Sequence, residues 1–270
     1  MRAAVIERFG EPPVVRDKDE PPADGADLIE VTAAPLNPVD LSIASGRFYG
    51  GTPPLPYVPG GEGIGTPGIA AYLAITRRAQ LQPGETVLVL GASGVLGSIA
   101  VQVAKLLGAG RVIAGGRDDR GLARARELGA DATVDLKQIE GLTDRIREAC
   151  GGQLQVVIDP IWGAPAVAAL EAMSPLGRFV QLGQSAGAEA TVKSATVRGR
   201  YLSILGYGSF LVPWEDQAVA YRRLVDYAAA GKIKVEVEVL PLDAVADAWK
   251  RQATSPHRKL VLSPRIPAAS

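Results

Sequence analysis

Residues 85–110 read ETVLVLGASGVLGSIAVQVAKLLGAG, and this stretch decides the fold. It begins with a short apolar run of the kind that is buried on both faces of a parallel sheet. A segment with apolar residues at helical spacing follows. Between the two, Gly91 permits a tight turn, Gly94 lets the backbone approach a pyrophosphate, and Gly97 lets the helix pack on the strand. Free N–H groups and the dipole at the helix N-terminus favour phosphate.

We therefore expect a dinucleotide-binding turn whose contacts come from Gly91, Ser93, Gly94, Val95, Leu96 and Gly97. The alternative is an ordinary turn between a strand and a helix that binds nothing.

Outward from this stretch, strand-like and helix-like segments alternate from Thr66 to about residue 232. Such alternation implies right-handed crossovers and predicts an α/β fold with a doubly wound parallel (Rossmann) sheet. Residues 1–65 are rich in Pro and Gly, with β-like runs at 2–6 and 28–33. Residues 233–270 hold two β-like runs around a helix. We expect a nucleotide-binding domain over 66–232, flanked by two β-rich segments.

The second predicted strand of this domain ends RVIAGGRDDR, at residues 111–120. A site for NAD has a carboxylate here to bind the ribose 2′-hydroxyl, whereas this chain has Gly116 and then Arg117. A guanidinium can bind a 2′-phosphate, so we expect NADPH as cofactor, with Arg117 and Arg120 as contacts. Alternatively, both arginines are solvated beside their acidic neighbours. Further cofactor contacts are expected at three strand ends: Ile161, Gly183 and Tyr207.

Composition excludes several functions. Lys+Arg and Asp+Glu are both 29, so no net charge favours nucleic acid or an anionic membrane. No apolar stretch approaches the length of a bilayer span. Cys150 is the one cysteine, so no internal disulfide can form, and we expect a reducing cytoplasmic location. Cys150 and His257 alone cannot build a zinc site of several such ligands within one chain.

Six segments distributed along the chain can be compared with known families: LNPVDLSIASGRF, PLPYVPGGEGIG, LQPGETVLVLGASGVLGSIAVQVAKLLGA, ARARELGADATVDL, PLGRFVQLG and SPHRKLVL. Together they resemble the medium-chain dehydrogenase/reductase superfamily, in its zinc-free quinone oxidoreductase branch. Members with catalytic zinc carry a Cys and a His where this chain has Asn37 and Gly61. In the family, further strands follow a motif such as GEGIG and complete a GroES-like barrel. Here Gly65 leads directly into Thr66 and a helix, so the resemblance implies a truncated GroES-like domain over 1–65, to which 233–270 returns. Its strands should have unpaired edges.

The resemblance implies hydride transfer from the nicotinamide to a small-molecule quinone, enone or carbonyl. Without a metal, hydrogen-bond donors must stabilise the developing oxyanion. Asn37 and Tyr49 are the candidate donors and Asp40 the organising residue, although Asn37 and Asp40 could instead cap the turn NPVD. The strand near 202–205 resembles the edge through which family members pair, so we expect a homodimer.

Other functions stay open at this stage. The missing barrel strands are compatible with a cofactor-binding sensor that has lost turnover, or with non-redox chemistry on a larger substrate. A hydrolase is a remote alternative, because GQSAG fits a nucleophile elbow and Ser185, Asp243 and His257 follow in that order. No helical pattern follows Ser185, however, and Cys150 has no histidine near it in sequence.

Overall fold

The computed structural model describes residues 1–20, 22, 30–60 and 66–267. The chain divides into two compact units. One combines Met1–Ile64 with Glu236–Ser270, and the other is Gly65–Val235. The first unit is therefore built from both ends of the sequence, with the second inserted between them.

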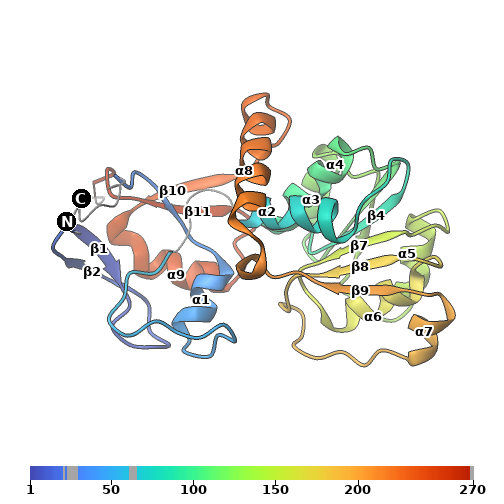
Figure 1. Cartoon of the computed structure of the whole chain (residues 1–270), viewed down its shortest axis with the longest axis horizontal. Helices are drawn as coiled ribbons and strands as arrows, with labels where there is room; N and C mark the ends of the chain where they lie inside the picture. Colours follow the sequence, from blue (N-terminus) through green and yellow to red (C-terminus); the bar gives the residue numbers. More distant parts are fainter. Residues whose placement is uncertain (21, 23–29, 61–65, 268–270) are drawn as a thin grey trace. The chain divides into compact units, whose positions relative to one another are not determined.

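A parallel sheet forms the centre of the Gly65–Val235 unit (Figure 1). Its strand order is β6-β5-β4-β7-β8-β9, and every neighbouring pair is parallel. The order reverses between β4 and β7, as in a doubly wound sheet, so the predicted fold class is confirmed. The strands are β4 (Thr86–Leu90), β5 (Arg111–Gly116), β6 (Ala132–Asp135), β7 (Val156–Asp159), β8 (Arg178–Gln181) and β9 (Ser203–Gly206).

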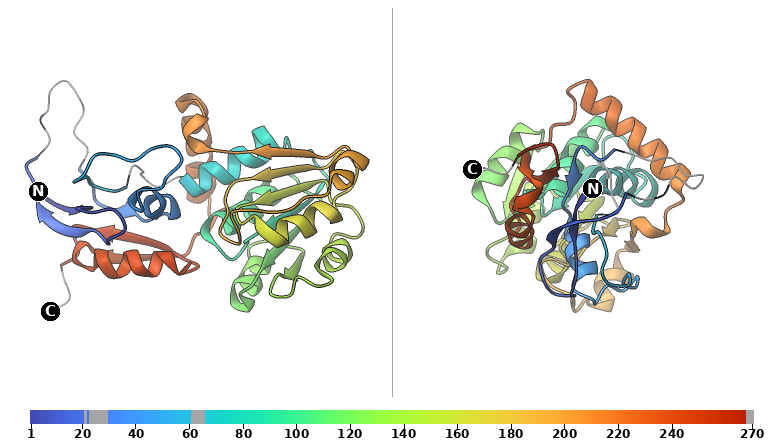
Figure 2. Two further views of the ribbon diagram at one scale, coloured as in Figure 1. Left: turned by 90° about the horizontal axis from the view of Figure 1, so that it is seen from below. Right: turned by 90° about the vertical axis from the view of Figure 1, so that its left-hand side faces the viewer.

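Helices cover both faces of this sheet, as the two views of Figure 2 show. α2, α3, α4 and α8 contribute to the hydrophobic cluster on one face, and α5, α6 and α7 to the cluster on the other. Strand β4 supplies both clusters, with Val87 and Val89 in the first and Leu88 and Leu90 in the second. The helical elements are α2 (Thr66–Leu73), the π-helical turn η1 (Ala74–Arg78), α3 (Val95–Leu106), α4 (Asp119–Glu127), α5 (Leu142–Ala149), α6 (Gly163–Ala172), α7 (Ser194–Gly199), η2 (Ser209–Leu211) and α8 (Trp214–Ala229).

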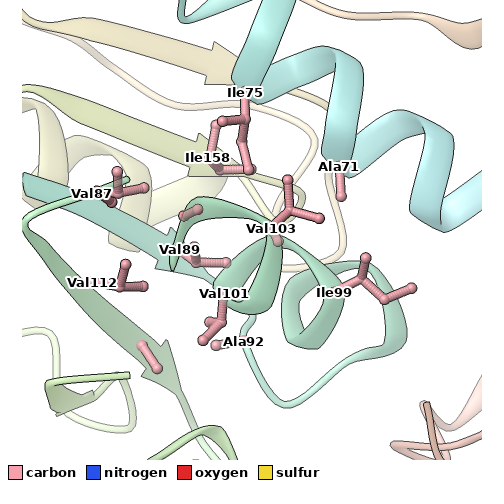
Figure 3. Packing of buried hydrophobic residues seen from close by; sticks show 14 of the residues in the cluster. Ala71, Ile75, Val87, Val89, Ala92, Ile99, Val101, Val103, Val112 and Ile158 are labelled. Atoms are coloured by element: carbon pink, nitrogen blue, oxygen red, sulfur yellow. The ribbon is translucent and has the colours of Figure 1, made fainter. Parts of the chain in front are cut away.

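Close packing of β-branched and small side chains holds α2 and α3 on the sheet (Figure 3). Ile75 from η1 lies against Ile158 of β7, and Val103 of α3 lies beside them. All three are fully buried. Burial of an aliphatic side chain stabilises a fold by about 1.5–3 kcal/mol, so this face alone anchors the helices firmly.

A buried glutamine fixes the end of this unit. Gln102 of α3 is 5% exposed, and its amide accepts from the N–H of Lys234 at 2.8 Å and donates to the Lys234 carbonyl at 2.9 Å. The contact joins residues 132 positions apart in the chain. It therefore ties the last residues before the unit boundary to the helix that follows the glycine turn.

The other unit holds two small sheets among its described residues. β1 and β2 pair antiparallel, whereas β10 is parallel and β3 antiparallel to β11. The expected strand at 28–33 is absent from its described residues 30–33, and the pairing occurs instead at Ala34–Pro35. The elements are β1 (Arg2–Val5), β2 (Val14–Asp17), β3 (Ala34–Pro35), α1 (Pro38–Ala44), β10 (Val237–Pro241), η3 (Leu242–Ala244), α9 (Val245–Ala253) and β11 (Lys259–Ser263).

The pairing of β10 among the described residues agrees with the unpaired strand edges expected of a truncated GroES-like domain. Within the described ranges no strand pairs with the outer side of β10. Val237 and Val239 of this strand are 51% and 49% exposed. Among the described helices, none combines the length and apolarity needed to cross a membrane.

Candidate cofactor site

The turn after β4 depends on glycine at two positions. Gly91 has φ +62°, in the left-handed region, and a Cβ on Gly97 would lie only 2.3 Å from the Gly91 carbonyl oxygen. No side chain can therefore replace the hydrogen of Gly97 without moving the backbone. Gly94 is the N-cap of α3, and Val95 and Leu96 form its first turn, half-buried against the core. This places the N-terminus of a twelve-residue helix at the carboxyl end of the central strand, where N–H groups and the helix dipole favour a phosphate.

Ser93 joins this turn to the end of β5. A Cβ on Gly121 would lie 2.4 Å from the Ser93 Cβ, and one on Gly116 would lie 3.5 Å from its hydroxyl oxygen. The N–H of Ala92 donates to the Gly115 carbonyl at 2.9 Å. The glycine turn and the strand end predicted to hold the ribose are therefore brought together.

Arg117 and Arg120 lie exposed at the start of α4. Their acidic neighbours bind other groups: Asp118 accepts from the N–H of Gly121 at 2.6 Å, and Asp119 pairs with Lys137 at 2.7 Å. Among the described residues, neither arginine forms an ion pair. Both guanidinium groups are thus accessible to an anionic ligand beside the end of β5.

The loops after β7 and β8 meet the glycine turn. The Ile161 Cγ2 lies 2.8 Å from the position of a Cβ on Gly91, and the Pro160 carbonyl oxygen lies 2.5 Å from that of a Cβ on Gly183. Three predicted contacts, Gly91, Ile161 and Gly183, are therefore neighbours at the point where the strand order reverses. An open α/β sheet binds its ligand at such a point.

Tyr207 follows β9, and its N–H donates to the Gln181 carbonyl at 2.9 Å. Its ring packs against the core cluster that includes α2 and α3, and burial raises its pKa. The structure therefore gives Tyr207 a packing role, and a cofactor contact stays a prediction.

The predicted catalytic residues belong to the other unit. Asn37 and Asp40 are 2% and 5% exposed, and the Asn37 N–H donates to Asp40 Oδ2 at 2.8 Å. The buried ammonium of Lys259, on β11, donates to Asn37 Oδ1. Tyr57 lies close enough for the Asp40 charge to contribute, after burial, to raising its pKa. Tyr49, by contrast, is 85% exposed. Asn37 and Asp40 thus start helix α1, as in the capping alternative, and their catalytic role stays a prediction.

The surroundings of Ser185 and of Asp243 both count against the hydrolase alternative. Ser185 is followed by turn residues, and the next helix, α7, begins at Ser194. Asp243 pairs with Arg2. Cys150 is buried at the end of α5, where burial raises its pKa to about 12. No three His, Cys, Asp or Glu side chains gather as metal ligands in the part of the chain that the structure describes. Gly61, the other position matched to a zinc ligand, lies outside the described residues.

Comparison with known proteins places the chain in a family. A family model described as zinc-binding dehydrogenase matches residues 95–225. Quinone oxidoreductase-like protein 2 of Rattus norvegicus is 31% identical over 184 residues, which are 66% of this chain and 52% of that protein. Prostaglandin reductase 1 of Sus scrofa is 32% identical over 177 residues, which are 63% of this chain and 54% of that protein. The chain spans about half the length of the curated relatives it matches.

A solved structure extends the likeness to both units. The quinone oxidoreductase of Thermus thermophilus, also determined in complex with NADPH, matches with a TM-score of 0.82 at 25% identity. The match covers 97% of this chain and 100% of that chain. The chain belongs to the medium-chain dehydrogenase/reductase superfamily.

Two residues of this superfamily member were missed by sequence reasoning. Lys259 comes next to Asn37 only because β11 pairs with β3, which no local pattern reveals. Asp159 ends the apolar strand VVID, and this abrupt acid after a buried run was a signal that could have been used. The Asp159 carboxyl is fully buried and accepts from the N–H groups of Ile161 and Trp162, both at 2.9 Å to Oδ1.

Asp159 makes the stability of the dehydrogenase/reductase fold dependent on pH. Burial raises the pKa of Asp159 from 3.8 to about 6, although the two N–H groups oppose this shift. At a pH between these two values, the folded state therefore holds a proton on Asp159 that the unfolded state has released. This contribution to stability is complete below the unfolded pKa and is lost as the pH rises through the folded value.

We expect the free energy of unfolding to lose about 3 kcal/mol from this group between about pH 4 and pH 6. The Asp159→Asn variant should lack this component, because its amide does not titrate. Denaturant unfolding of both proteins across this range measures the difference, in which all other groups cancel. Parallel curves for the two proteins would show that Asp159 titrates normally.

Proposed function

We propose that the chain binds NADPH at the carboxyl ends of β4, β5, β7 and β8 and reduces a quinone, an enone or a carbonyl compound without zinc. The observation that carries this proposal is the cradle left by Gly91 and Gly97, which presents the N-terminus of α3 beside two accessible arginines. The NADPH complex of the Thermus thermophilus relative supports the choice of cofactor.

The described residues fit this cofactor in three places. The first turn of α3 offers backbone N–H groups to the pyrophosphate. Arg117 and Arg120 offer charge-assisted hydrogen bonds to a 2′-phosphate, which a carboxylate at this position would repel. Ile161 and Gly183 lie where the strand order reverses and would line the nicotinamide end. When bound, the reduced nicotinamide supplies the hydride.

The substrate oxygen gains negative charge as the hydride is transferred, and hydrogen-bond donors lower the barrier by stabilising it. In this proposal Asn37 and Tyr49 are the donors and Asp40 holds Asn37 at the start of α1. Tyr49 is exposed and offers its hydroxyl freely to a ligand. The Asp40 contact fixes the backbone of Asn37.

A specific observation favours a second candidate function, a sensor that binds NADPH without turnover. Asn37 is 2% exposed, and its Oδ1 accepts from Lys259. An Asn37 side chain buried in this way contributes to the packing of its unit and has little surface to offer a substrate.

Calorimetric titration with NADPH and NADH, followed by a panel of quinones and enones, separates these functions. We expect NADPH to bind more tightly than NADH and to lose its absorbance in the presence of at least one acceptor. Tight binding with no turnover would favour the sensor. No binding of either nucleotide would contradict both functions.

The preference for NADPH depends on the arginines in this proposal. Arg117→Ala should weaken NADPH binding by roughly tenfold or more, since a hydrogen bond to a charged group contributes about 1.5–3 kcal/mol. NADH binding should be unchanged, because NADH has no 2′-phosphate. Calorimetry on both nucleotides tests this, with the exposed Arg198 of α7 changed to Ala as the control. Equal losses for both nucleotides would remove the assignment of Arg117.

We also propose a homodimer formed through β9. This strand ends the six-stranded sheet, and one side of it has no partner strand among the described residues. Ile204 of this strand is 41% exposed. Phe210 and Leu211, a few residues later in the chain, are 65% and 91% exposed. Antiparallel pairing of two β9 strands about a twofold axis would satisfy the open edges and cover these side chains.

Light scattering coupled to size-exclusion chromatography should therefore give the mass of a dimer. Ile204→Lys should shift the protein to monomer, because two lysines would then meet at the axis. Ile139→Lys, at a similarly exposed isoleucine of the same unit, should leave the dimer intact. A monomeric unaltered protein would contradict the proposal.

A further inference from the structure

The connection between β7 and α6 is organised by one buried carboxylate. Asp159 is 0% exposed, and its Oδ1 accepts from the N–H groups of Ile161 and Trp162, each at 2.9 Å. The second oxygen lies 3.2 Å from the Trp162 nitrogen. Successive backbone N–H groups thus converge on a charge inside the protein, where such bonds are strong.

The same connection holds its backbone in an unfavourable conformation. Trp162 has φ +56° and ψ −158°, close to a region that is almost restricted to glycine. Gly163 follows with φ +70°, and a Cβ on it would lie 2.9 Å from the Ala186 carbonyl oxygen. Such strain persists only where the surrounding structure enforces it. The hydrogen bonds to Asp159 hold the backbone N–H of Trp162, while its ring packs edge-on against Phe179, with the ring centroids 6.0 Å apart.

This conformation positions Ile161 beside the glycine turn. Its Cγ2 is pressed to within 2.8 Å of the position of a Cβ on Gly91, and its carbonyl oxygen accepts from the Ala186 N–H at 2.7 Å. The loop thus lies between the glycine turn and the segment after β8. A shift of Ile161 would alter the surface on which the cofactor is proposed to lie.

We propose that Asp159 is a positioning residue of the cofactor site, whose ionised carboxylate holds the Pro160–Trp162 loop against the glycine turn and so couples cofactor affinity to pH. The inference rests on the proposed binding of NADPH. The inference goes beyond that proposed binding, because it assigns control of NADPH affinity to a residue outside the proposed cofactor contacts.

Burial and the two N–H groups are the influences that set the pKa of Asp159 among its described neighbours. Ile158, the preceding residue of β7, pairs with Val89 of β4, and Asp159 itself pairs with Gln181 of β8. The glycine turn contributes Gly91, and α6 begins with Gly163. None of these described neighbours titrates. Burial raises the pKa of Asp159 to about 6, so the carboxylate changes its charge within the range in which enzymes are assayed.

Fluorine NMR of protein labelled with 5-fluorotryptophan observes the loop without any ligand. The chain has 3 tryptophans, and Trp162→Phe identifies the resonance of Trp162. We expect that resonance to move with a midpoint near pH 6, and to stop moving in Asp159→Asn. Asp144→Asn, at an exposed carboxylate of α5 with 80% side-chain exposure, is the matched control and should leave the titration intact.

NADPH titrations at about pH 7.5 and about pH 5 complete the test. Asp159→Asn and Asp159→Ala should bind NADPH roughly tenfold more weakly than the unaltered protein at the higher pH, as expected for loss of a hydrogen bond to a charge. At the lower pH the Asn variant and the unaltered protein should converge. The 2′-phosphate itself titrates near pH 6, but it does so equally in both proteins and cancels in their ratio.

The outcomes separate this inference from the proposed function. Unchanged affinity in both Asp159 variants, with no pH-dependent movement of the Trp162 resonance, would overturn the positioning role while leaving NADPH binding intact. No NADPH binding by the unaltered protein would overturn the proposed function and the coupling together. In that case a Trp162 resonance that titrates only when Asp159 is present still supports the positioning of the loop.

Discussion

No side chain fits between helix α3 and the turn that precedes it. A Cβ at Gly97 would meet the Gly91 carbonyl oxygen at 2.3 Å, and a Cβ at Gly110 would meet the Gly84 carbonyl oxygen at 2.5 Å. The β4–α3–β5 unit is therefore closed by backbone contact at both of its ends. This closeness lets α3 bury seven of its residues and places its N-terminus at the carboxyl end of β4. Every feature of the candidate cofactor site is built around that end.

At the end of β7, the features that organise the candidate site also lower the stability of the fold. An ionised Asp159 lowers the stability of the fold near neutral pH, because a buried charge is less well solvated than it is in the unfolded chain. Trp162 adds backbone strain at the same loop. The two hydrophobic clusters on either side of the sheet stabilise the unit enough to offset both costs. A buried charge and a strained residue at a strand end, facing a glycine turn, are typical of a functional position rather than a structural one.

The features predicted from the sequence are those encoded locally. The run of Thr86–Leu90, the glycine spacing and the helical period of α3 lie within one continuous stretch, so the doubly wound sheet followed from them. Arg117 and Arg120 could be proposed as cofactor contacts from the sequence because they lie just after the end of β5, and their role stays a prediction. Asp159 was missed because its importance depends on complete burial, and Lys259 because its contact with Asn37 spans 222 residues. The strand expected at 28–33 was wrong for its described residues, since pairing with β11 selected Ala34–Pro35 instead.

The unit built from both ends of the chain is held together by a different kind of contact. Its core joins Ile6 and Leu36 to Trp249 and Leu260, and the buried Lys259–Asn37 hydrogen bond links the same two segments. Removing either polar partner would leave the other buried without it, which is more costly than never having formed the pair. These contacts are non-local, whereas the inserted Gly65–Val235 unit is built from consecutive strand–helix–strand steps. Closing long loops costs entropy before any contact is gained, so these non-local contacts are more costly to form than the local steps of the inserted unit. The same long sequence separation explains why the contact of Lys259 with Asn37 could not be predicted from a local pattern.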